Sequence, residues 1–227
     1  LPLLIAPFRI LMGHRSDTHR SAIGWKRVPY IWIGTTLQFG GLSIMPFALL
    51  LLSRPENFTL GIIASIAAFL LTGAGIHMTQ TAGLALATDM AKPDKRPRAV
   101  ALLYVMLLIG MMFAALVIGS MLRDFSPTRL VQVIQSAAML TAVLNLIALW
   151  KQEGRNPAVI SKDTPRPPFK QMWHQYLERP DTGRLLVAIG LGTAAFAMQD
   201  ALLEPFGGEI LGMSVGATTT LTAAWAF

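Results

Sequence analysis

His77 is the residue best placed for chemistry, because it lies near the middle of an apolar stretch, residues 60–88. An ionisable side chain at membrane depth costs about 3 kcal/mol on insertion scales, so it is retained where it faces a site, a cavity or a ligand. A neutral imidazole can ligate a metal through one ring nitrogen while the other donates a hydrogen bond. His77 is therefore a candidate ligand, with a buried histidine bonded to Gln80 or to a neighbouring helix as the alternative.

Helical spacing gives the stretch around His77 two different faces. The face of His77 carries mostly polar side chains, namely Gln80, Thr81, Leu84 and Thr88. The other face repeats small residues every four positions, Gly75, Thr79, Gly83 and Ala87, a pattern that lets a neighbouring helix approach closely. We expect the second face to pack and the first to address a ligand or a polar partner.

A second polar segment follows the last complete apolar run. It contains Gln199, Asp200, Glu204 and Glu209, together with Pro205, Gly207 and Gly208. Asp200 and Glu204 are one helical turn apart, and Pro205 with the glycines is expected to break or turn the helix. The segment is either a polar gate, proton site or partner contact, or a helix end paired with Arg123 or Arg129.

Membrane helices must carry these residues. Of 227 residues, 53% are hydrophobic and 14% are charged, and the mean hydropathy is +0.53. Apolar runs of about 20 residues can cross a hydrocarbon core as helices. We predict an all-α polytopic membrane protein with complete spans at 29–52, 60–88, 99–121, 130–150 and 185–206. Apolar residues at 1–11 and from 217 onward predict further helices, so we expect a fragment of a larger bundle.

Positive charge predicts the orientation. Sixteen of the 19 Lys and Arg residues fall in blocks 9–27, 92–98 and 151–184, which the positive-inside rule places in the cytoplasm. These loops explain the net charge of +7, so nucleic acid is not an expected partner. The sequence contains no nucleophile and base pair, metal-ligand cluster or phosphate loop, so we do not expect an enzyme.

The block 151–184 is longer than the other loops. Its first part, 153–168, is rich in proline and polar residues and predicts an extended or flexible linker. Its second part places apolar side chains at helical spacing, namely Phe169, Met172, Trp173, Tyr176 and Leu177. We predict a short amphipathic helix, either in the membrane interface or packed against the underside of the bundle.

Two basic loops contain acids near helix ends. One loop contains Gly13, Asp17, Gly24, Lys26 and Arg27. It resembles the loop between the second and third helices of the major facilitator superfamily, which locks helix ends together. The other loop contains Asp89, Arg96 and Arg98, and it resembles the superfamily's loop after its fourth helix. A carboxylate at a helix C-terminus opposes the helix dipole, so Asp89 needs a cation, which Lys92, Arg96 or Arg98 can supply. We predict a structural latch in preference to substrate contact.

Longer strings resemble a more specific family. Four strings are similar to the PucC/LhaA proteins, the bacteriochlorophyll delivery branch of that superfamily: MGHRSD, GWKRVPYIWIGT, HMTQTAGLALATDMAKPDKRPRAVALLYVMLLIGMM and GLGTAAFAMQDALLEPFGGEILGMSVGATT. The resemblance covers nearly the whole chain. It implies a major facilitator superfamily-like bundle from the end of helix 2 to the start of helix 8. The N-terminal half would be 1–150, the central loop 151–184 and the start of the C-terminal half 185–227.

The resemblance also implies a function. We expect an assembly factor for photosynthetic light-harvesting complexes, in the intracytoplasmic inner membrane of a bacterium, that binds bacteriochlorophyll and delivers it to antenna polypeptides. His77 would ligate the chlorin Mg, with Gln80 and Thr81 beside it. Carotenoid and lipid are further candidate ligands, and the reaction centre complex and bacteriochlorophyll synthase are further candidate partners.

Two other functions remain open. A proton-coupled secondary transporter of a small solute would use Asp200 or Glu204. Against it, the complete spans between 29 and 150 hold no carboxylate in their interiors, and Asp89 lies at a helix end. A scaffold subunit that binds neither pigment nor solute is the third possibility.

Overall fold

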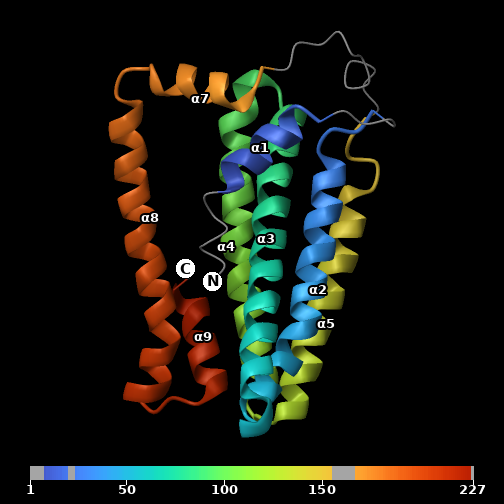
Figure 1. Ribbon diagram of the computed structural model, residues 1–227, viewed down its shortest axis with the longest axis vertical. Helices are drawn as coiled ribbons and strands as arrows, with labels where there is room; N and C mark the ends of the chain where they lie inside the picture. The colour runs from blue at the N-terminus through green and yellow to red at the C-terminus, as the bar shows by residue number, and fades with distance from the viewer. Residues whose placement is uncertain (1–7, 20–23, 155–166, 226–227) are drawn as a thin grey trace. The chain divides into compact units, whose positions relative to one another are not determined.

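The structure is a computed structural model that describes residues 8–19, 24–154 and 167–225. The described residues form helices joined by turns and include no strand (Figure 1). In chain order the α-helices are α1 (Arg9–Asp17), α2 (Val28–Leu52), α3 (Phe58–Met90), α4 (Arg96–Met121), α5 (Pro127–Leu149), α7 (Phe169–Leu177), α8 (Thr182–Pro205) and α9 (Val215–Trp225). Helices α2, α3, α4, α5 and α8 are long and apolar enough to cross a membrane. This confirms the all-helical class and the five predicted candidate spans.

Proline marks the start of several helices. Pro29 lies in the first turn of α2, and Pro127 is the first residue of α5. Short 3-10 turns that begin with proline, Pro55–Asn57 and Pro93–Lys95, precede α3 and α4. Proline suits a first helical turn because the N–H that it lacks would have no acceptor inside the helix. Such prolines show where a helix can begin, and the predicted limits of the five spans differ from the observed limits by no more than three residues.

Helices α2 and α3 pack with their backbones almost in contact. A Cβ atom on Gly34 would lie 2.9 Å from the carbonyl oxygen of Gly75, and a Cβ atom on Gly75 would lie 2.5 Å from the carbonyl oxygen of Gly34. Further along α2, a Cβ atom on Gly41 would lie 2.6 Å from the carbonyl oxygen of Ala68. Real Cβ atoms essentially never approach another atom within 3.0 Å, so this packing requires glycine at all three positions.

Only part of the small-residue repeat predicted on α3 contacts α2. Gly75 and Thr79 lie against Gly34 of α2, but a Cβ atom on Gly83 would meet no described atom within 4 Å. Most buried residues of α3 follow alternating steps of four and three, namely Gly61, Ser65, Ala68, Thr72, Gly75, Ala82 and Leu86. A row with steps of four drifts by about 40° per step around a helix, whereas alternating steps stay on one face. The face that packs on α2 therefore passes through Ala82 rather than Gly83.

Polar side chains connect α5 to α2. Asn145 Nδ2 donates a hydrogen bond to Thr35 Oγ1 at 2.9 Å, and Gln135 Nε2 donates to the backbone oxygen of Ser43 at 2.9 Å. Such bonds between membrane helices contribute about 1 kcal/mol each. Near the cytoplasmic end predicted from charge, the three helices share a small core made by Ile31, Ala82 and Leu86, with Tyr30 and Leu149 packed against it.

The chain divides into two compact units, residues 1–103 with 127–164 and residues 104–126 with 165–227. Helices α1, α2, α3 and α5 belong to the first unit. In the second, α4 and α9 cross closely, since a Cβ atom on Gly216 would lie 2.7 Å from the carbonyl oxygen of Gly119. Helix α7 leads into the start of α8 and is steeply inclined to it (Figure 1), and the rings of Phe169 and Trp173 stack with centroids 6.1 Å apart. An amphipathic helix is present where the sequence predicts it, and its depth in a bilayer stays a prediction.

The end of α8 agrees with the predicted break or turn. The α-helix ends at Pro205, but the chain continues as a π-helical turn, Phe206–Ile210, and reaches a left-handed residue at Gly212, with φ +62°. Proline cannot donate the backbone hydrogen bond of an α-helix, and a wider π turn accommodates that loss. The α-helix therefore ends at Pro205, and Gly207 and Gly208 lie in the turn that follows, as the sequence predicts.

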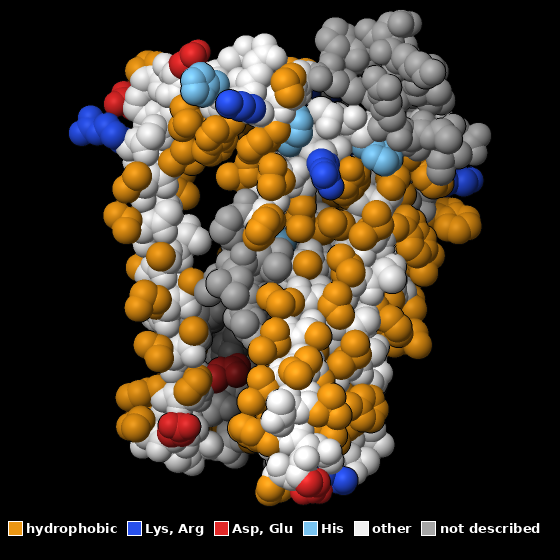
Figure 2. Space-filling model, viewed as in Figure 1, with side chains coloured by type: hydrophobic (Ala, Val, Ile, Leu, Met, Phe, Trp, Pro, Cys, Tyr) orange, Lys and Arg blue, Asp and Glu red, His pale blue; other side chains and the backbone are white. Residues whose placement is uncertain are grey.

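Hydrophobic side chains cover the long helices on the face shown in Figure 2. On α4, Leu102, Tyr104 and Phe113 are exposed by 59%, 54% and 66%. Apolar exposure along helices of this length is typical of surfaces that face lipid. Together with the five candidate spans, it indicates a multi-pass membrane protein.

Candidate functional site

His77 lies near the middle of α3, which extends from Phe58 to Met90. Its side chain is partly buried, and its Nδ1 atom is fully covered by protein. Its backbone oxygen accepts a hydrogen bond from Thr81 Oγ1 at 2.6 Å. Because Nδ1 is covered, a ligand of this imidazole would have to bind through Nε2.

Thr81 is engaged by contacts within the protein. Besides donating to His77, its hydroxyl accepts a hydrogen bond from Arg9 Nε of α1 at 3.2 Å. Helix α1 lies against this side of α3, since a Cβ atom on Gly13 would lie 3.6 Å from the Thr81 methyl group. Gln80, by contrast, is exposed. Of the two residues predicted to assist His77, Gln80 is better placed to meet a ligand.

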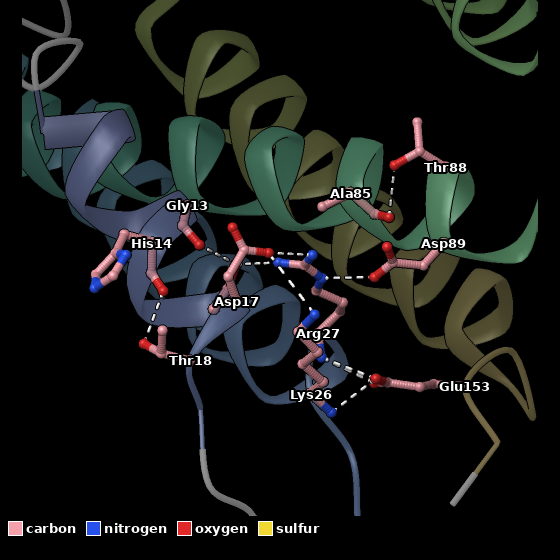
Figure 3. Close-up of polar contacts among 11 residues, drawn as sticks. Gly13, His14, Asp17, Thr18, Lys26, Arg27, Ala85, Thr88, Asp89 and Glu153 are labelled. Carbon is pink, nitrogen blue, oxygen red and sulfur yellow. Dashed lines mark hydrogen bonds and ion pairs between the residues drawn. The ribbon is translucent and has the colours of Figure 1, made fainter. Parts of the chain in front are cut away.

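The two predicted latch loops meet at Arg27, directly before α2 (Figure 3). Only 5% of the Arg27 side chain is exposed. Its guanidinium pairs with Asp17 and with Asp89, where Nε lies 3.0 Å from Oδ2. Its Nη1 also donates to Ser16 Oγ at 2.7 Å. One buried cation thereby joins the C-terminal ends of α1 and α3.

Both acids occupy positions where an isolated negative charge is unfavourable. Asp17 is the last residue of α1, and Asp89 is next to last in α3, where the final carbonyl groups carry partial negative charge. Arg27 offsets both charges. The cation that the structure supplies to Asp89 is thus Arg27, 62 residues away, whereas the expected Arg96 and Arg98 are exposed near the start of α4.

Glu153 completes the arrangement, although its sequence context predicts a linker. Its carboxylate accepts hydrogen bonds from the backbone N–H groups of Lys26 at 2.7 Å, Arg27 at 3.0 Å and Val28 at 2.9 Å. Amides at a helix start have no acceptor within the helix, and the dipole there favours an anion. Glu153 therefore caps α2 from 125 to 127 residues away. We name Ser16, Asp17, Arg27, Asp89 and Glu153 the Arg27 cluster.

The remaining latch residues have smaller roles in this geometry. Gly24 is buried and adopts a φ of +80°, a left-handed conformation that favours glycine. Lys26 Nζ lies 3.8 Å from Asp17 Oδ1. The structure therefore brings together Asp17, Lys26, Arg27 and Asp89 from the predicted set. The rest of the block 153–168 lies mostly outside the described residues.

The polar segment of the second unit forms an open surface. Gln199, Glu204 and Glu209 are exposed on α8 and the π turn that follows, and the side chain of Asp200 lies outside the described part of the structure. Gln199 and Glu209 line a shallow groove of about 450 Å³. Within the described ranges, no group of three or more His, Asp or Glu side chains could hold a metal ion. A role as polar gate or partner contact stays a prediction.

Comparison with known proteins gives matches along the whole chain. The family model described as PUCC protein matches residues 1–227. Protein PucC of Rhodovulum sulfidophilum is 53% identical, over 99% of this chain and 51% of the relative. The uncharacterized protein in the puhA-bchM intergenic region of Rhodobacter capsulatus is 52% identical, over 100% of this chain and 48% of the relative. The bacteriochlorophyll synthase 44.5 kDa chain of Rhodobacter capsulatus is more distant, at 26% identity over 92% of this chain and 47% of the relative.

The chain spans about half the length of these curated relatives. No solved structure matches it. The family match extends from the first residue to the last, and about half of the aligned residues are identical in the two nearer relatives named above. The chain therefore belongs to the PUCC protein family.

Proposed function

We propose that this protein is an assembly factor for photosynthetic light-harvesting complexes, which binds bacteriochlorophyll in the membrane and delivers it to antenna polypeptides. Family membership supports the proposal, as does a relative named as a bacteriochlorophyll synthase chain. The observation that carries it is the partly buried His77 near the middle of a candidate membrane span. Carotenoid and lipid are further candidate ligands, and the reaction centre complex and bacteriochlorophyll synthase are further candidate partners.

The residues around His77 suit a Mg-chlorin in one arrangement. When bound, the pigment would supply a magnesium ion, a Lewis acid that a neutral imidazole can ligate. His77 would provide that ligand through Nε2, because Nδ1 is covered. The exposed amide of Gln80 can donate to a carbonyl group on the macrocycle rim. Thr81, held by Arg9, fixes the turn of α3 that carries the backbone oxygen of His77.

Pigment binding is tested by purifying the intact protein from pigmented membranes and recording its near-infrared spectrum. We expect stoichiometric bacteriochlorophyll, which is lost or spectrally shifted in His77→Ala. His174→Ala is the matched control, since His174 is exposed on α7, outside the candidate spans, and it should keep the parent spectrum. Circular dichroism and gel filtration show whether each variant is folded. Folded, pigment-free parent protein that catalyses proton-dependent uptake of a solute into vesicles would replace this function with secondary transport.

We also propose a major facilitator superfamily-like bundle in the bacterial inner membrane, with the basic loops cytoplasmic. Support comes from the three basic blocks of the sequence and from the Arg27 cluster, which joins the loops that resemble the superfamily's latch. The chain contains no cysteine, so single cysteines report the orientation against a clean background. An impermeant maleimide should label Glu56→Cys in spheroplasts and Lys95→Cys only after lysis. The reverse pattern would overturn the orientation.

A further inference from the structure

An open groove lies in the first unit between the start of α2 and the end of α5. It has a volume of about 500 Å³, and three indole rings contribute to its walls, those of Trp25, Trp32 and Trp150. Leu146 and Leu149 add aliphatic surface from α5. Two of these tryptophans are exposed, Trp32 by 42% and Trp150 by 72%. The groove is therefore largely apolar, with tryptophan side chains in its walls.

The charge at this groove is positive where it meets solvent. Glu153 and Lys151 both line it, but the carboxylate of Glu153 accepts three backbone N–H groups at the start of α2. Its negative charge is thereby offset by the positive end of the helix dipole. Lys151 is exposed, and its ammonium is the charge that an arriving molecule would meet.

The backbone at Lys151 is held in an unfavourable conformation. Its φ is +56°, in the left-handed region that costs a residue with a Cβ atom roughly 1–2 kcal/mol relative to the helical conformation. This conformation ends α5 and turns the chain, so that Glu153 can reach the amides of Lys26 and Val28. The same turn places Lys151 on the border of the groove.

We propose that this groove binds an anionic phospholipid. The phosphate would lie against the Lys151 ammonium and the indole N–H groups, and an acyl chain would follow Leu146 and Leu149 along α5. Tryptophan is enriched at membrane interfaces because its ring is apolar and its N–H is polar. Basic pockets between membrane helices on the cytoplasmic side suit anionic head groups. The inference is independent of pigment binding, because none of these residues belongs to the His77 face of α3.

Native mass spectrometry of the delipidated intact protein tests this proposal. The protein is incubated with equal amounts of phosphatidylglycerol and phosphatidylcholine that carry the same acyl chains. We expect phosphatidylglycerol to be favoured about fivefold, the factor expected for one basic side chain near an anionic lipid. Lys151→Gln should reduce the ratio towards one, and Lys151→Arg should preserve it. Lys95→Gln, at another exposed lysine of the predicted cytoplasmic side, is the matched control and should preserve it too.

Two further measurements place the lipid and separate binding from folding. Phosphatidylglycerol with brominated chains should quench tryptophan emission, and the quenched fraction should fall when Trp32 and Trp150 are replaced by phenylalanine. Lys151→Gly should raise the melting temperature by relieving the left-handed φ, while still lowering the lipid preference. Equal binding of the two lipids, or equal effects of Lys151→Gln and Lys95→Gln, would overturn the proposal. Bound bacteriochlorophyll that shields Trp150 from the brominated lipid would assign the groove to pigment and overturn it as well.

Discussion

Replacement of Arg27 by methionine should strongly destabilise the first unit. The side chain is 5% exposed and connects Asp17, Asp89 and Ser16, and methionine keeps much of its length. Removing one partner of a buried ion pair costs about 3–5 kcal/mol, because a charge is left unpaired. Here Asp17 and Asp89 are 45% and 48% exposed, so water can solvate them in part and reduce the loss. We therefore expect the free energy of unfolding to fall by about 2–3 kcal/mol.

The assay is unfolding of the intact protein by sodium dodecyl sulfate in mixed micelles, followed by circular dichroism. Arg98→Met is the matched control, since Arg98 is exposed at the start of α4, and it should change the free energy by no more than about 0.5 kcal/mol. Asp89→Asn should cost about 1 kcal/mol in the parent but almost nothing in Arg27→Met, where its charge has lost its partner. Equal stability of Arg27→Met and Arg98→Met, or additive effects of Arg27→Met and Asp89→Asn, would show that Arg27 does not stabilise the protein by pairing with these acids.

Two other substitutions test the packing and the cap. Gly75→Ala should destabilise the protein by about 1–3 kcal/mol, because its Cβ atom would lie 2.5 Å from the carbonyl oxygen of Gly34. Gly83→Ala, with open space around it, should be neutral or stabilise α3 by up to about 1 kcal/mol. The same unfolding titration measures both glycine variants. Equal losses of unfolding free energy in the two would contradict the α2–α3 crossing. Glu153→Ala should cost about 1–2 kcal/mol through loss of the α2 cap. The exposed neighbour Gln152 provides the control Gln152→Ala, which should have little effect on the melting temperature, and similar losses for the two variants would argue against capping.

The membrane helices could be predicted from sequence because one local property determines them. An apolar run of sufficient length must close its backbone hydrogen bonds as a helix. A proline near each start indicates where the helix begins. The amphipathic helix α7 follows from the same kind of local pattern. Gly83 shows the limit of this reasoning, because which small residues contact α2 depends on how the two helices cross.

The Arg27 cluster could be predicted only in part. The acids at the ends of α1 and α3 indicate by their positions that cations are required. Nearby residues in the chain were the natural candidates, yet Arg27 pairs with Asp89 from 62 residues away. Glu153 offered no local signal, because its hydrogen-bond partners lie at least 125 residues earlier in the chain. Such pairings become visible only when the helices are placed in space.

The proposed ligation of bacteriochlorophyll by His77 can be tested by ligand rescue. His77→Gly removes the imidazole, and the intact variant is purified from pigmented membranes with and without added imidazole. We expect pigment per protein to fall to a small fraction of the parent value and to recover when imidazole enters the vacated space and binds the magnesium in place of His77. A folded His77→Gly variant that retains the parent pigment content and spectrum without imidazole would contradict it.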